Sequence, residues 1–271
     1  MKKITIALLC LSFSFVAQGL LAQASRTKAK AVVIKKAAPK TAAKETVKET
    51  PKATVGEASK DAGKEIPKEK AFDYGYGPAD AAVITLGPQV WIAKNLAVTT
   101  FANGDKIEQV QSDQEWINAG KEQRPAWCYY ANDPANGPIY GVLYNWWAVA
   151  DPRGLAPAGW HVPTKYEWLP FFDFLGGKAE GGHKLKSTAL WQPIGGPDRN
   201  GSNETGFGAV PGGLRFAADG TFSQLGERCQ FWTATENESE RGAMVYLGIS
   251  HEVDNSIAQK GFGYSVRCVK D

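Results

Sequence analysis

Hard oxygen ligands gather in one glycine-rich stretch of this 271-residue sequence. Asp198, Asn200, Asn203 and Glu204 stand in it as Asp-x-Asn-Gly-x-Asn-Glu. Carboxylate and amide oxygens are the groups that Ca²⁺ prefers, so these four residues are a candidate calcium site. The stretch lacks the spacing of an EF-hand loop, and Asp, Asn and Gly are also the ordinary residues of turns. A turn without any metal is therefore the alternative.

A second candidate site combines an aromatic ring with polar side chains. Trp232 is followed by Thr235, Glu236 and Asn237 where a strand-like stretch ends. A Trp face can stack on a sugar ring while neighbouring oxygens and amides bind its hydroxyls, so this patch is the predicted ligand-binding site. The alternative is that Trp232 belongs to the core, as most of the nine Trp must.

Three cysteines, Cys128, Cys229 and Cys268, follow the N-terminal leader. An odd number allows at most one intramolecular disulfide. Cys229 and Cys268 both lie in strand-like stretches and form the preferred pair. Three buried free thiols are the alternative.

No catalytic constellation is evident. His161, His183 and His251 are scattered, without the spacing of a zinc site, and no Cys-x-x-Cys motif occurs. His161 stands between Trp160 and Val162, and we expect it to be a hydrogen-bonded structural residue. We therefore assign no catalytic residue.

The elements that position these residues centre on Gly159 to Gly177. Thr164 and Glu167 have the spacing of a capping box and predict a helix start. The buried face of that helix is predicted from the three- and four-residue spacing of its aromatic and apolar residues, which are Trp168, Phe171, Phe172 and Leu175. Pro170 predicts a kink or a break. A second capping box, Ser112 with Glu115, predicts another short helix.

Strand signals lie on both sides of this helix. Residues 82–86 and 89–92 predict a hairpin around Gly87-Pro88. Towards the C-terminus, short apolar stretches predict one small antiparallel sheet with a Trp-rich face: 214–218, 221–225, 228–235, 243–250 and 263–270.

The chain divides by composition into three parts. Residues 1–24 hold Lys2-Lys3, an apolar run and Ala22-Gln23-Ala24, which is typical of a signal peptide. Residues 25–70 contain no aromatic residue and predict a disordered Lys/Ala/Glu/Pro-rich linker. Residues 71–271 hold every Trp and predict one globular domain.

Charge is distributed unevenly between these parts. The linker holds 13 Lys/Arg against 6 Asp/Glu, a net of +7, whereas residues 71–271 hold 16 against 22, a net of −6. The linker is either a plain tether or a basic arm that contacts an anionic envelope polymer. We expect no nucleic-acid partner and no transmembrane segment after signal cleavage.

Several motifs occur in the order of a known family. The sequence resembles the Fibrobacter succinogenes major paralogous domain at 90–96, 128–133, 140–146, 159–164, 206–213, 231–236 and 265–271. The resemblance implies an α+β, C-type-lectin-like fold with small antiparallel sheets, two short helices and long ordered loops. That fold is shared with formylglycine-generating enzymes. It also implies export to the periplasm, the outer-membrane surface or the extracellular space.

Two departures from the family pattern bear on the cysteines. Ala156-Pro157 stands where a Cys-Pro pair is common, and Cys229 stands where an aromatic residue is usual, so no disulfide pattern carries over. The stretch from Met244 to Val266 lacks the cysteine pair of formylglycine-generating enzymes. We expect a non-catalytic envelope or surface module that binds a glycan or a protein. The alternatives are an enzyme of the formylglycine-generating or hydrolytic type and a purely structural envelope component.

Overall fold

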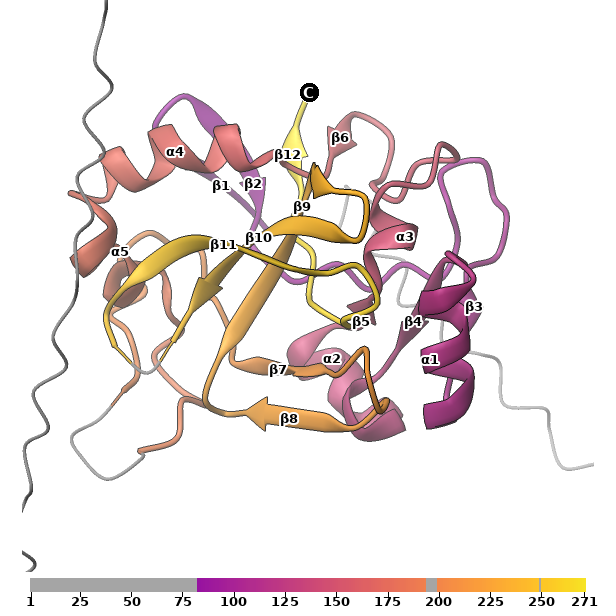
Figure 1. Ribbon diagram of the computed structural model, residues 1–271. Helices are drawn as coiled ribbons and strands as arrows, with labels where there is room; N and C mark the ends of the chain where they lie inside the picture. Colours follow the sequence, from indigo (N-terminus) through magenta and orange to yellow (C-terminus); the bar gives the residue numbers. More distant parts are fainter. Residues whose placement is uncertain (1–81, 194–198, 249) are drawn as a thin grey trace, which may run out of the picture. The chain divides into compact units, whose positions relative to one another are not determined.

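One sheet holds the strands from both ends of the domain. The computed structural model describes residues 82–193, 199–248 and 250–271 (Figure 1); the predicted signal peptide and linker lie outside them. The antiparallel strand order is β1 (Val83–Leu86), β2 (Gln89–Ile92), β12 (Val269–Lys270), β6 (Trp160–His161). Leu86 pairs with Gln89, so Gly87-Pro88 forms the predicted turn, and Gly87 has a φ of +59° that only glycine adopts easily.

The longest strands form a second antiparallel sheet. Its order is β11 (Val253–Gln259), β10 (Arg241–Leu247), β9 (Cys229–Glu238). Strand β11 has no apolar signal in the sequence, because its residues VDNSIAQ are mostly polar. The strand exists because β10 supplies a complete register of backbone partners for it.

Two smaller sheets complete the strand content of the described residues. One is the hairpin β7 (Gly212–Arg215) with β8 (Phe222–Leu225). In the other, β3 (Glu108–Gln109) runs parallel to β4 (Ala126–Cys128), which is antiparallel to β5 (Leu143–Tyr144). The prediction that the C-terminal strands form a single sheet is therefore wrong. The predicted strands are divided among three sheets, and the last strand, β12, pairs with β2 and β6.

The helices are short and more numerous than the two predicted. The described residues hold α1 (Asp113–Lys121), α2 (Gly137–Tyr140), α3 (Trp146–Val149), α4 (Lys165–Phe174), α5 (Lys178–Leu185) and the 3₁₀ turns Tyr130–Asn132 and Pro134–Asn136. Among them, no helix has the length and apolar character needed to cross a membrane.

Both predicted helix starts form, Thr164 with a complete capping box and Ser112 with the N-cap half of one. Glu115 N–H donates to Ser112 Oγ at 3.1 Å, and the Glu167 carboxylate accepts from Thr164 N–H at 2.7 Å. Pro170 does not break α4, because it lies on the exposed side, where water can solvate the carbonyl that its missing N–H leaves free.

The glycine pair in α5 explains why that helix was not predicted. Glycine disfavours helices, but a Cβ on Gly182 would lie 2.5 Å from the carbonyl oxygen of His251. Close packing of α5 on the chain that leads into β11 therefore requires glycine here.

A cluster of aromatic rings joins α4 to the first and second sheets. Trp168 is fully buried, with its ring centroid 4.8 Å from that of Trp91, 5.8 Å from Phe231 and 5.9 Å from Phe207. The predicted buried face of α4 is confirmed: Trp168, Phe171, Phe172 and Leu175 are each at most 2% exposed.

We predict that Trp168→Ala lowers the free energy of unfolding by about 3–5 kcal/mol, because it leaves a large cavity among these rings. Tyr166 lies on the same helix and is 64% exposed, so Tyr166→Ala should change stability by about 0.5 kcal/mol or less. Urea denaturation of both variants checks this. Equal midpoints would show that the aromatic cluster does not stabilise the domain.

Candidate functional site

The sheet of β9, β10 and β11 is packed on one face and only half covered on the other. Phe231 and Val245 point into the aromatic cluster around Trp168. On the opposite face, Gln230 pairs with Tyr246, and Trp232 pairs with Met244. Paired residues share a face, so these four side chains form one surface.

Only the Trp232 end of that surface is closed. The rings of Trp232 and Tyr264 lie 4.6 Å apart, and Trp232 Nε1–H donates to the Tyr144 carbonyl at 2.9 Å. The end with Gln230 and Tyr246 stays open and forms the floor of a groove. The β7–β8 hairpin and the chain around Phe262 supply its walls.

This groove encloses about 720 Å³, within the range of small-molecule sites. Its apolar lining combines four aromatic rings, those of Phe216, Tyr246, Phe262 and Tyr264, with the aliphatic side chains of Leu214, Met244, Ile257 and Ala258. Polar side chains come from β8, β9 and the turn between them, which contribute Gln224, Gln230 and Arg228, and from Ser250, Glu252 and Ser256 on the other side. The groove therefore combines ring faces with amide and guanidinium groups.

Gln230 is the polar residue at the floor. It is 4% exposed, and its Nε2 donates to Gln224 Oε1 at 2.8 Å. Its Oε1 accepts no hydrogen bond from any described residue. A buried acceptor without a partner costs about 1–3 kcal/mol, so a hydroxyl or amide donor that enters the groove would be bound favourably.

Gln224 holds the turn in an unusual conformation. Its φ is +66°, a left-handed value that costs free energy for a residue with a side chain. The conformation is fixed because Gln224 O accepts from the N–H groups of Glu227 at 3.0 Å and of Arg228 at 3.1 Å. The strained residue thus presents its amide to Gln230 and places Arg228 on the groove.

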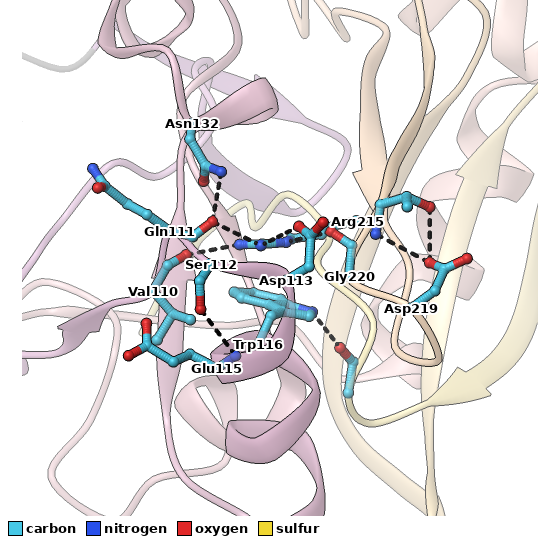
Figure 2. Close-up of polar contacts among 12 residues, drawn as sticks. Val110, Gln111, Ser112, Asp113, Glu115, Trp116, Asn132, Arg215, Asp219 and Gly220 are labelled. Atoms are coloured by element: carbon cyan, nitrogen blue, oxygen red, sulfur yellow. Dashed lines mark hydrogen bonds and ion pairs between the residues drawn. The ribbon is translucent and has the colours of Figure 1, made fainter.

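The buried guanidinium of Arg215 holds the β7 wall in place, as Figure 2 shows. Nη1 donates to Val110 O at 2.7 Å, Nη2 to Gln111 O at 3.0 Å, and Nε to Gly220 O at 2.8 Å. The group lies 4.7 Å from the centroid of the Trp116 ring. Arg215 therefore ties the hairpin to α1 and to the chain before it.

We predict that Arg215→Met lowers the free energy of unfolding by about 3–5 kcal/mol, because it leaves several buried carbonyl acceptors without a hydrogen-bond donor. Asp113 also pairs with Arg215 but is 58% exposed. Asp113→Asn should therefore cost about 1 kcal/mol or less. Guanidinium chloride unfolding compares the two variants. Similar losses would show that the ion pair, and not the carbonyl contacts, carries the stabilisation.

The other rim of the groove includes Gly248, Ser250 and Glu252. Lys186, from the end of α5, is fully buried, and its Nζ donates to Ser250 O at 2.8 Å. Burial, together with the charge of nearby Arg199, lowers the pKa of Lys186 to about 8. The ammonium therefore fixes this rim at the cost of keeping a charge out of water.

This lowered pKa predicts a pH dependence of stability. Between about pH 8 and the ordinary lysine value of 10.5, the unfolded chain keeps a proton that the folded chain has lost. The free energy of unfolding of the wild type should therefore rise through that window relative to Lys186→Met, which lacks the titrating group. Thermal melts of both chains from pH 7 to pH 10 measure the difference. A constant difference would refute the shift.

The predicted patch around Trp232 is not assembled. Trp232 is fully buried, so its ring is unavailable for stacking on a sugar. Thr235 Oγ1 accepts from Lys165 N–H at 3.0 Å, and Glu236 pairs with buried Lys260, while Asn237 is exposed. Trp232 is closed off because Tyr264 covers this end of the strand face, and the open groove lies at the opposite end of the same face.

The candidate calcium loop is only partly described. Asp198 lies outside the described residues. Asn200 Oδ1 accepts from Trp191 N–H, Asn203 Oδ1 accepts from Gly208 N–H, and Glu204 lies 3.5 Å from Lys184. These three side chains serve the loop and its neighbours. Within the described ranges, no cluster of three or more His, Cys, Asp or Glu could hold a metal ion.

The preferred disulfide between Cys229 and Cys268 is wrong. Both thiols, like that of Cys128, are free and buried, and burial raises the pKa of each to about 12. Cys229 begins β9, whereas Cys268 precedes β12, and the two pack in different parts of the core, which explains why they do not pair. The alternative of three buried thiols describes the structure.

His161 has the structural contacts expected of it. Nε2 lies 2.7 Å from the Glu167 carboxylate, and Nδ1 lies 2.7 Å from that of Asp271. Partial burial opposes the charge on the ring, but the two carboxylates outweigh it and raise the pKa of His161. The residue therefore links the start of α4 to the C-terminus.

Comparison with known families identifies the domain. The Fibrobacter succinogenes major domain matches residues 84–270, well over half of the chain. The chain belongs to this family. No curated protein and no solved structure matches it. The predicted family is therefore confirmed for this member of the Fibrobacter succinogenes major domain family.

The groove residues were missed because no local motif marks them. Gln230 and Trp232 lie two residues apart in one strand and therefore on one face, a signal that was available. Which end of the face is open depends on Tyr264 and on the β7–β8 hairpin, and both reach it from elsewhere in the chain.

Proposed function

We propose that this domain is a non-catalytic binding module of an exported envelope or cell-surface protein, and that its groove binds a glycan. The observation that carries the proposal is the open end of the β9–β11 surface. There the unpartnered Oε1 of buried Gln230 lies among aromatic side chains.

The chemistry of the lining fits a sugar better than a purely apolar ligand. A pyranose ring has an apolar face that can stack on Tyr246 or Phe262 and hydroxyls at its edge that donate and accept hydrogen bonds. Gln230 Oε1 provides a fixed acceptor for one hydroxyl, and Ser256 on β11 offers a further polar contact.

The rest of the chain supports the wider proposal. The leader at residues 1–24 has the composition of a signal peptide, which favours export to the envelope or beyond. The mixed α+β domain with small, mainly antiparallel sheets is compatible with the C-type-lectin-like fold that we propose for it.

We predict that Tyr246→Ala weakens glycan binding at least about tenfold, equivalent to about 1.4 kcal/mol, because it removes a ring from the groove. Tyr166→Ala is the matched control, since Tyr166 is a more exposed tyrosine on α4 that does not line the groove. Glycan-array screening of the full chain, followed by calorimetric titration of the best ligand, measures both variants.

Retained binding in Tyr246→Ala, or equal losses in both variants, would contradict a site in the groove. Failure of the wild type to bind any glycan on the array would contradict the glycan proposal itself.

A further inference from the structure

We infer that the groove selects an acidic glycan, with the guanidinium of Arg228 binding a carboxylate of a uronic acid residue. This inference rests on the proposed function and narrows its ligand class. It is carried by the position of Arg228 beside Gln230 and by the lack of any protein group that satisfies its charge.

Arg228 differs from the other arginines of the described residues. Its side chain lines the groove, is exposed, and makes no hydrogen bond or ion pair within the described ranges. Every other arginine there interacts with another group, and these are Arg124, Arg153, Arg199, Arg215, Arg241 and Arg267. A guanidinium that faces a cavity without a partner is available for an anion of the ligand.

The residues beside Arg228 indicate which kind of molecule carries the anion. Guanidinium groups bind carboxylates through two parallel hydrogen bonds, which a planar carboxylate matches. Gln230 lies two residues after Arg228 in the chain, and its Oε1 lacks a hydrogen-bond donor such as a hydroxyl. Tyr246, paired with Gln230 across the strands, supplies a ring face beside both. A carboxylate and a hydroxyl on one stackable ring describe a uronic acid.

Glu252 is the acidic residue among those that line the groove, and it limits where the carboxylate can lie. Arg228 precedes β9 and Glu252 precedes β11, with β10 between these strands. At about 4.8 Å per strand the two positions are roughly 10 Å apart, close to the screening length at physiological salt. The carboxylate is therefore favoured at the Arg228 end and disfavoured at the other, which orients the ligand.

The net charge of the globular part does not explain a preference for an acidic glycan. Residues 71–271 hold 16 Lys/Arg against 22 Asp/Glu, so the globular part as a whole repels an anion. Selection of an acidic sugar must come from a local contact, and substitution of one arginine should abolish it.

The experiment titrates the full chain with a panel of short oligouronides, each paired with the same oligomer after reduction of every carboxylate to a hydroxymethyl group. We expect at least one acidic oligomer to bind about tenfold or more tightly than its reduced partner. R228Q should abolish that preference while leaving affinity for the reduced oligomer within about twofold. R228K should keep part of it, because lysine retains the charge without the planar fork.

R124Q is the control variant, since Arg124 lies outside the groove and pairs with Glu108 and Glu122. The Lys-rich residues 25–70 are present in every chain, so nonspecific attraction of the polyanion is the same throughout. A preference that survives R228Q, or that R124Q removes equally, overturns the assignment to Arg228.

The outcomes also separate this inference from the proposed function. Equal affinity for the acidic and reduced oligomers, with both lost in Tyr246→Ala, refutes acid selection and leaves glycan binding intact. Absence of binding to every oligomer, together with an empty glycan array, refutes both.

Discussion

Buried cations that bind backbone carbonyls are the constraint on which this domain depends. Its strands and helices are short, so much of the chain is irregular and leaves carbonyls without partners in a ladder or a helix. Arg267 is 1% exposed and donates to Asn95 Oδ1 at 2.7 Å, to Phe207 O at 2.9 Å and to Ile92 O at 3.2 Å. It thereby joins the first sheet, the loop before β7 and the C-terminal segment. Burial lowers the pKa of Arg267 to about 10, yet the group remains charged at neutral pH.

Three other buried cations also bind backbone carbonyls, and each has an aromatic ring beside its charge. Arg215 lies over Trp116, Lys186 over Trp191 and Lys260 over Trp146, at 4.7, 4.2 and 4.5 Å from the ring centroids. Each also donates to a backbone carbonyl. Two of these cations set the walls of the groove: Arg215 fixes β7, and Lys186 fixes the rim at Ser250. The abundant Trp residues therefore stabilise charge as well as fill the core.

The sequence did not locate the groove. Polar side chains beside an aromatic strand led to a predicted glycan site around Trp232, whereas the groove lies at the other end of the same face of β9. Trp232, the residue that looked most suited to stacking, is closed off by Tyr264 and Tyr144. Gln230, two residues earlier, had no distinguishing pattern, because its importance comes from an unpartnered oxygen that only the packed structure defines. Cys229 and Cys268 failed as a pair for a related reason, since strand-like sequence does not show in which part of the core a residue packs.

Local chemistry in the sequence determined the capped helices, the first hairpin, the buried face of α4 and the family. Capping boxes, a Gly-Pro turn and aromatic spacing act within a few residues, so their outcome does not depend on the rest of the chain. Tertiary structure decided the polar strand β11, the helix around Gly181-Gly182, the division of the C-terminal strands among sheets and the open end of the groove. Each of these depends on a partner distant in sequence: β10 supplies the ladder for β11, and the carbonyl of His251 requires glycine in α5. Their free energy comes from contacts that exist only after the chain has folded, so no local pattern records them.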